Sequence, residues 1–175
     1  DSVEISGDKK TAAVSVTTEN TGDYAGKAVV QVYAQAPYTD YDKQYHIEKS
    51  AVQLLDFEKT NLLQPGESQT ITMEIDMANL ASYDSEHAGT YVVTPGDYYL
   101  AVGEDSHDAL NNILAAQGKT TEDGMTEEGD AGKSWQWTWD GDVDTVTFAT
   151  SKAGVEITNA LSDGDYATDI NSFMP

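Results

Sequence analysis

The chain has 175 residues, enough for one domain with a sizeable hydrophobic core, and it contains no cysteine, which excludes disulfides, thiol catalysis and cysteine metal sites. Its 31 acidic residues stand against nine lysines and no arginine, giving a formal net charge of −22, so binding to nucleic acid or to an anionic membrane surface is not expected. No apolar run approaches the roughly 20 residues that a membrane span needs, so this segment is not expected to insert into a membrane.

The first third of the chain alternates between short apolar strands and turns. Val3 to Ile5 predicts a short edge strand, and residues 12–19 predict a longer one with Ala12, Val14 and Val16 on one face. Residues 28–35 (AVVQVYAQ) are β-branched and aromatic, which predicts a strand buried on nearly both sides. The cluster Asn20-Thr21-Gly22-Asp23 predicts a turn before it.

A polar loop is expected over residues 37–48. It carries Tyr38, Tyr41 and Tyr45, which could stack on a sugar, pack under a neighbouring domain or lie on the end of the folded unit. All three interpretations stay open at the sequence level.

The clearest strand pattern follows the turn Pro65-Gly66. Residues 68–76 place Ile71, Met73 and Ile75 on one face and polar side chains on the other, as in a strand between a core and water. Residues 50–57 (SAVQLLDF) predict a strand before that turn.

Further strands are predicted over residues 90–94 and 98–102, separated by the turn Pro95-Gly96-Asp97, while residues 77–84 predict a short helical or 3₁₀ turn. Six or seven strands with turn signals at this spacing predict an all-β fold, an immunoglobulin-like or fibronectin type III-like antiparallel β-sandwich.

The spacing of the apolar residues changes after residue 103. Leu110, Ile113, Leu114 and Gln117 follow helical spacing, which predicts a short helix over residues 106–117 capped by Ser106. An exposed acidic loop is expected over 119–133, then an extra C-terminal strand in which Trp135, Trp137 and Trp139 share one face. Residues 143–148 and 155–158 predict two more strands, and the remaining tail is acidic and loop-like.

Several ordered motifs resemble the fibronectin type III-like domain of glycoside hydrolase family 3, whose best-known members are β-glucosidases. The resemblance covers roughly residues 11–108, in the motifs TTENTGDYAGKAVVQVY, LLDFEKTNLLQPGESQTITMEID, LASYD, YVVTPGDYYLAVG and SHD. The tail EITNALSDGDYATDINSFMP resembles the passage into the catalytic barrel in members with reversed domain order.

The resemblance implies a non-catalytic accessory domain inside a longer retaining hydrolase that acts on β-glucosides or related oligosaccharides. Its partners would be the α/β sandwich domain and the barrel catalytic domain of the parent enzyme, which it would brace against each other. The expected organisation is a sandwich over 1–104, added elements packed on it over 105–158, and a linker over 159–175. Because neighbouring domains would normally cover part of it, we expect the isolated chain to expose an apolar patch.

The resemblance assigns no catalytic residue here, because the barrel that supplies the nucleophile lies outside this chain and no Asp or Glu matches a catalytic motif. A retaining hydrolase needs two carboxyl groups about 5 Å apart across the sugar.

Two other kinds of site remain as hypotheses. The stripe Trp135, Trp137 and Trp139 could bind an oligosaccharide, as in a carbohydrate-binding module, or be buried in the core or at a domain interface. No cofactor is expected, with calcium as the alternative: Asp140, Asp142 and Asp144 have the spacing of a calcium loop, although Thr145 and Ser151 break the EF-hand pattern. Asp163, Asp165 and Asp169 give a similar signal, and an acidic adhesion or stalk module is the corresponding function.

Overall fold

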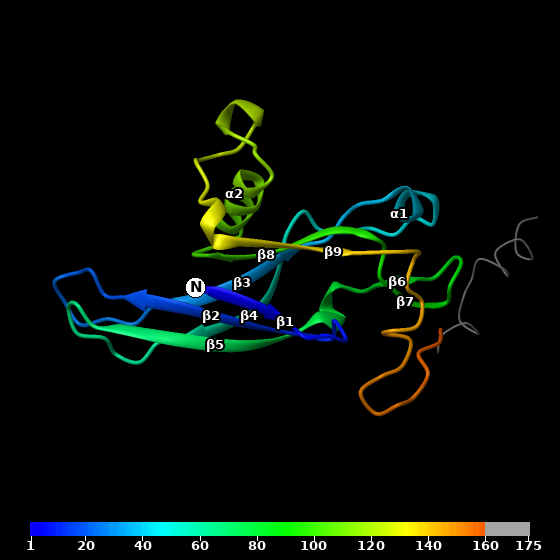
Figure 1. The fold of residues 1–175 in the computed structure, drawn as a ribbon, viewed down its shortest axis with the longest axis horizontal. Coiled ribbons are helices and arrows are strands. Elements are labelled where there is room, and N and C mark those ends of the chain that lie inside the picture. The colour runs from blue at the N-terminus through cyan, green and yellow to red at the C-terminus, as the bar shows by residue number, and fades with distance from the viewer. Residues whose placement is uncertain (160–175) are drawn as a thin grey trace, which may run out of the picture.

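The computed structural model describes residues 1–159 as two antiparallel sheets packed face to face, with a small hairpin at one end (Figure 1). The first sheet has the strand order β1 (Ser2–Ile5), β2 (Thr11–Glu19) and β5 (Ser68–Asp76). The second sheet has the order β4 (Gln53–Lys59), β3 (Val29–Gln35), β8 (Gly96–Gly103) and β9 (Ser134–Trp139). The hairpin consists of β6 (Ser82–Asp84) and β7 (Thr90–Val92). The predicted antiparallel β-sandwich is confirmed.

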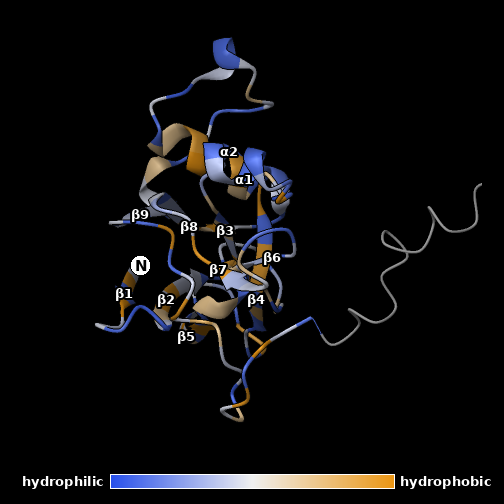
Figure 2. Ribbon diagram, turned by 90° about the vertical axis from the view of Figure 1, so that its right-hand side faces the viewer, coloured by the Kyte–Doolittle hydropathy of each residue, from blue (hydrophilic) through white to orange (hydrophobic). Residues whose placement is uncertain are grey.

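The main core lies between the inner faces of the two sheets. Ile71, Met73 and Ile75 of β5 are buried as their alternation predicts, and they share this core with Val32 and Leu100 of the second sheet. Figure 2 shows the hydrophobic residues gathered along these strands, whereas the loop beyond the long helix is hydrophilic. A strand with one apolar face and one polar face is stable only when such a partner sheet covers it.

A second, smaller core lies on the outer face of the second sheet, where α2 (Ser106–Ala116) packs (Figure 1). Tyr99 and Ala101 of β8 contact Ala109 and Ile113 of the helix. Alternate residues of β8 therefore face two different cores, so this strand is buried on both sides. Within the described residues, no helix combines the length and the apolarity needed to cross a membrane.

The predicted helix is present and Ile113 is buried as expected, but the predicted cap was wrong and the buried face is rotated. Asp105 rather than Ser106 caps it, accepting hydrogen bonds from the backbone N–H groups of His107 and Asp108. Ala109, Asn111, Asn112 and Ile113 are the buried residues, whereas Gln117 is exposed.

Asn112 explains the rotation of the helix. Its amide group donates to the carbonyl of Val102 (3.0 Å), and its oxygen accepts from the backbone N–H of Asp130 (2.7 Å). A polar side chain on the buried face thus joins the loop over residues 119–133 to the sheet.

The predictions of strands over residues 143–148 and 155–158 were wrong. Residues 143–148 and 155–158 form isolated bridges only, Val93 with Asp144 and Thr150 with Glu156. The carboxylate of Asp144 accepts hydrogen bonds from the backbone N–H groups of Val146 and Thr147, so the local turn uses donors that a strand would offer to a neighbour.

The strand expected over 50–57 begins at Gln53, and the loop expected over 37–48 contains the short helix α1 (Asp40–Gln44). The predicted linker, with Asp163, Asp165 and Asp169, lies outside the described residues apart from Asn159.

The close approach of β8 to α2 depends on Gly103. A Cβ atom at this position would lie 2.7 Å from the backbone nitrogen of Ala109, too near for any side chain. We therefore expect Gly103→Ala to lower the free energy of unfolding by about 1–3 kcal/mol, because the helix must move away from the sheet. Urea denaturation followed by tryptophan fluorescence measures this.

The matched control is Gly7→Ala, where an added Cβ would meet no atom within 4 Å. We expect this variant to stay within about 0.5 kcal/mol of the wild type. Equal effects of the two substitutions would contradict the close packing of α2 on β8.

Candidate interaction surface

Two loops meet at one end of the sandwich (Figure 1). The first runs from residue 36 to 52 between β3 and β4 and contains α1, and the second connects β6 to β7. Both are held by a buried carboxylate: Asp42 in the first loop and Asp84 at the base of the second are fully buried. Because an unpaired buried charge is costly, the partners of these two groups determine how the loops are arranged.

Asp42 is part of the cap of α1. One of its oxygens accepts hydrogen bonds from the backbone nitrogen (2.7 Å) and the hydroxyl (2.8 Å) of Thr39, while Thr39 caps the N-terminus in return. Its other oxygen lies 2.9 Å from the ammonium group of Lys49, which is only 7% exposed. The two oxygens of the carboxylate are thus both engaged within the loop.

Lys49 connects the first loop to the rest of the sandwich. Its ammonium group also donates to the carbonyl of Pro37 (3.0 Å) and to the hydroxyl of Thr94 (2.7 Å), in the segment between β7 and β8. Burial lowers the pKa of Lys49 below its usual value, although the bond to Asp42 opposes this shift. The buried ammonium group is thus compensated by two hydrogen bonds and by its ion pair with Asp42.

Asp84 holds the second loop. It accepts hydrogen bonds from the Tyr41 hydroxyl (2.6 Å) and from the backbone N–H groups of Glu86, His87 and Ala88. Burial alone would raise the pKa of Asp84, but these hydrogen bonds to the charged form hold it below its usual value. Burial and the bond to Asp84 raise the pKa of Tyr41 in turn. The bond between Tyr41 and Asp84 also joins the two loops to each other.

Aromatic and charged side chains lie above these two anchors. The rings of Tyr45 and His87 are stacked with centroids 4.5 Å apart, and Tyr41 tilts against Tyr45 at 4.6 Å. His46, at a positive φ of 53°, places its Nδ1 atom 3.0 Å from the carboxylate of Glu86. We call this group the end platform; its members are Tyr41, Tyr45, His46, Glu86 and His87. Tyr38 is half-exposed and lies with Tyr99 and Gln117 around a separate hollow.

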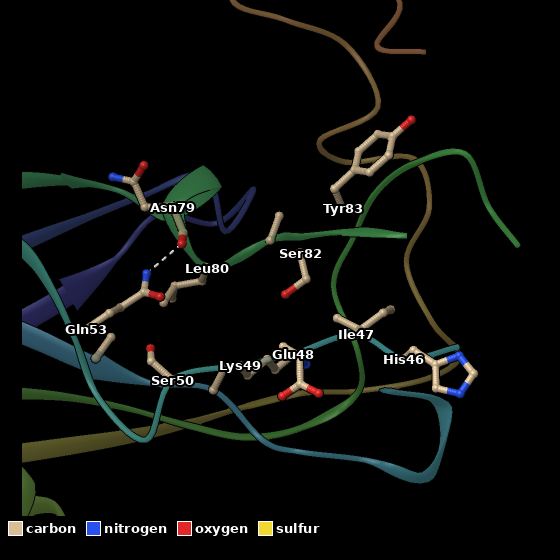
Figure 3. Close-up of a pocket in the computed structure, with 13 residues that line it drawn as sticks. His46, Ile47, Glu48, Lys49, Ser50, Gln53, Asn79, Leu80, Ser82 and Tyr83 are labelled. Atoms are coloured by element: carbon tan, nitrogen blue, oxygen red, sulfur yellow. Dashed lines mark hydrogen bonds between the residues drawn. The ribbon is translucent and has the colours of Figure 1, made fainter. Parts of the chain in front are cut away.

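A pocket of about 340 Å³ opens beside the end platform, between residues 46–53 and residues 79–83 (Figure 3). Ser50 and Ser82 extend into it from opposite walls, and Gln53 bonds across it to the carbonyl of Asn79 (2.6 Å). The buried side chains of Ile47 and Leu80 contribute its apolar part. The pocket therefore offers hydroxyl and amide groups to a polar partner.

The three tryptophans lie on the inner face of β9. Trp137 is paired with Tyr98 in the strand register, and the two rings stack with centroids 5.3 Å apart. Trp139 is buried against Tyr98 and Phe148, and Trp135 is half-buried on the same face. Of the interpretations open at the sequence level, this geometry favours burial in the core.

The acidic triplet after β9 is not arranged around a common point. Asp144 accepts hydrogen bonds from its own turn, including one from the Thr147 hydroxyl (2.6 Å), and although burial would raise its pKa, these bonds lower it. Asp140 and Asp142 are both exposed. Among residues 1–159, no three His, Cys, Asp or Glu side chains are grouped so as to hold a metal ion.

The arrangement of the end platform was missed at the sequence level, apart from its tyrosines. Asp42, Lys49 and Asp84 are ordinary polar residues in polar stretches, and nothing local indicates that they are buried. One usable signal was present: Thr39 followed three residues later by Asp42 has the spacing of a capping box, which indicates the start of a helix.

Comparison with known proteins gives a consistent result. The family model of the fibronectin type III-like domain matches residues 28–106, which confirms the resemblance noted in the turn motifs. A β-glucosidase from Kluyveromyces marxianus is 36% identical over 99 residues, which are 56% of this chain and 11% of that protein.

Solved structures agree with this match. The GH3 β-glucosidase of Bifidobacterium adolescentis is 30% identical with a TM-score of 0.51, over 60% of this chain and 14% of its own. A β-glucosidase of Kluyveromyces marxianus in complex with glucose has a TM-score of 0.57 over 80% of this chain and 13% of its own; at 24% identity this shows similarity of fold alone. The chain spans about a tenth of the length of the curated relatives it matches.

The ion pair of Asp42 and Lys49 predicts a large effect on stability. Lys49→Met leaves a buried carboxylate without its counter-charge, and we expect it to lower the free energy of unfolding by about 3–5 kcal/mol. Asp42→Asn combined with Lys49→Met should recover part of this loss, because no buried charge remains. Denaturation of the two variants in urea measures both values.

Lys152→Met is the matched control, since Lys152 pairs with Asp76 at 2.7 Å but its side chain is 89% exposed. It should change the stability little. If Lys49→Met is as mild as this control, the loop does not depend on the buried pair.

The lowered pKa of Asp84 predicts a dependence on pH. The folded state keeps this carboxyl ionised below its ordinary pKa of 3.8, so its contribution to stability is present above that pH and is lost as the pH falls through the folded value. Asp84→Asn removes this contribution. The difference in unfolding free energy between wild type and Asp84→Asn should therefore be constant from pH 7 to about 5 and shrink below pH 4. Parallel curves down to pH 3 would show that Asp84 titrates normally.

Proposed function

Because the chain contains a fibronectin type III-like domain of the kind carried by family 3 β-glucosidases, we propose that it is a non-catalytic accessory module of such an enzyme. Its role is to brace the barrel catalytic domain against the α/β sandwich domain, in an enzyme that acts on β-glucosides or related oligosaccharides. The observation that carries this proposal is the extent of the match: similarity is confined to about a tenth of each relative.

The two buried carboxylates support a structural role rather than catalysis. A retaining glycosidase needs one carboxylate free to attack the sugar and a second group to exchange protons with it. Asp42 is held by Lys49 and Thr39, and Asp84 accepts four hydrogen bonds, so neither is free to react. Their engagement instead makes the loops rigid, which suits a surface that a neighbouring domain must meet reproducibly.

The end platform and its pocket support contact with a protein neighbour. Tyrosine side chains are frequent in the buried parts of protein interfaces, where their rings add contact area with little loss of conformational freedom. The pocket beside them offers hydroxyl and amide groups to a polar loop. In this proposal the end platform is therefore one of the surfaces that orient the module within the enzyme.

The proposal is tested in the chain alone and in the full-length enzyme. The chain alone is expected to hydrolyse aryl β-glucosides no faster than buffer. In the enzyme, Lys49→Met should speed thermal inactivation while leaving KM for the substrate nearly unchanged, because it loosens the brace and not the active site. Lys152→Met is the control and should leave the inactivation rate as it is. An enzyme that keeps its activity and heat resistance after deletion of residues 1–139 would overturn the bracing role.

A further inference from the structure

The outer face of the four-stranded sheet is only half covered. On the side of β8, α2 packs over Tyr99 and Ala101, and this small core also includes Tyr33 of β3. The helix therefore covers β8 and the adjoining end of β3 (Figure 1). The far half of the same face, over the other end of β3 and over β4, lies beyond it.

The strand register identifies the side chains on that far half. Tyr33 points outward, toward α2, so Val29, four residues earlier on β3, lies on the same outer face. On β4, Phe57 is opposite Gln31 and Leu54 is opposite Tyr33, with a bulge between them that turns Leu55 inward. The exposed fractions are 45% for Val29, 46% for Leu54 and 62% for Phe57. We call these three residues the β3–β4 strip.

Charged residues protect the edge of β4 against pairing with another strand, but nothing covers the apolar side chains of the strip in the described residues. β4 is the last strand of its sheet and carries Asp56, Glu58 and Lys59, charges that oppose pairing with a strand from another molecule. The apolar side chains between these charges remain in water. A partner would therefore dock on the face of β4 rather than extend the sheet at its edge.

We infer that the β3–β4 strip is the docking site for an apolar surface of another domain of the same enzyme, an inference that rests on the proposed function. A second copy of this chain is disfavoured, since each carries a net charge of −22. Three side chains are also far too few for a stable complex of separate molecules. A neighbour in the same polypeptide is held at high effective concentration, so a small apolar contact is sufficient.

The test is Phe57→Asp, with Val146→Asp as the matched control, because Val146 is 78% exposed and lies outside the strip. In the chain alone, both variants should unfold at nearly the wild-type denaturant concentration, which shows that neither disturbs the fold. In the full-length enzyme, Phe57→Asp should speed thermal inactivation roughly tenfold, the equivalent of losing one buried apolar side chain. It should also raise hydrogen exchange in the residues of β4, whereas Val146→Asp should do neither.

The outcomes separate this inference from the proposed function. If Lys49→Met weakens the enzyme but Phe57→Asp behaves like Val146→Asp, the module braces the enzyme through another surface and the strip is not the docking site. If neither Lys49→Met nor Phe57→Asp has an effect, both proposals fail. If the chain alone sediments as a dimer that Phe57→Asp dissociates, a second copy covers the strip and the inference is overturned.

Discussion

The end of the sandwich depends on one constraint: a charge removed from water must be met by an opposite charge and by hydrogen bonds. Asp42 and Lys49 satisfy it together, the carboxylate through Thr39 and the ammonium group through Pro37 and Thr94. Pro37 and Thr39 lie at the start of the loop, whereas Thr94 comes from the segment between β7 and β8. The pair therefore determines the course of the loop between β3 and β4 more strongly than any local preference of its residues does.

The rest of the structure follows from how β8 is shared between two cores. Tyr98 and Leu100 face the interior of the sandwich, while Tyr99 and Ala101 face α2. A strand buried on both sides cannot shift its register, since a shift by one residue would exchange the two faces. Tyr98 also donates to the carbonyl of Thr94, the residue whose hydroxyl contacts Lys49. Thr94 therefore connects β8 of the four-stranded sheet to Lys49, in the loop that carries the end platform.

Most of the strands were predictable from the sequence, because their partners impose a simple rule on it. Ile71, Met73 and Ile75 alternate with polar residues, and β5 has the predicted bounds. The prediction was wrong where one side chain overrides the pattern: Asp144 takes up the N–H groups that a strand over 143–148 would have used, and Asn112 turns a different face of α2 inward. The anchors of the end platform were beyond prediction, because burial of Asp42 and Asp84 depends on residues up to 52 positions away. Only the capping box at Thr39 had a local signal.

The end platform and the β3–β4 strip would contribute different things to one docked module. Apolar contact is non-directional, so the strip can add binding energy without defining an angle. The platform is the opposite case, since Tyr41 is bonded to the buried Asp84 and the rings of Tyr45 and His87 are stacked, so these side chains lose little freedom on contact. The acidic surface adds a third element, because repulsion between copies keeps the strip available for a neighbour in the same chain. A brace needs all three: attraction toward its neighbour, a defined orientation, and no competing attraction to itself.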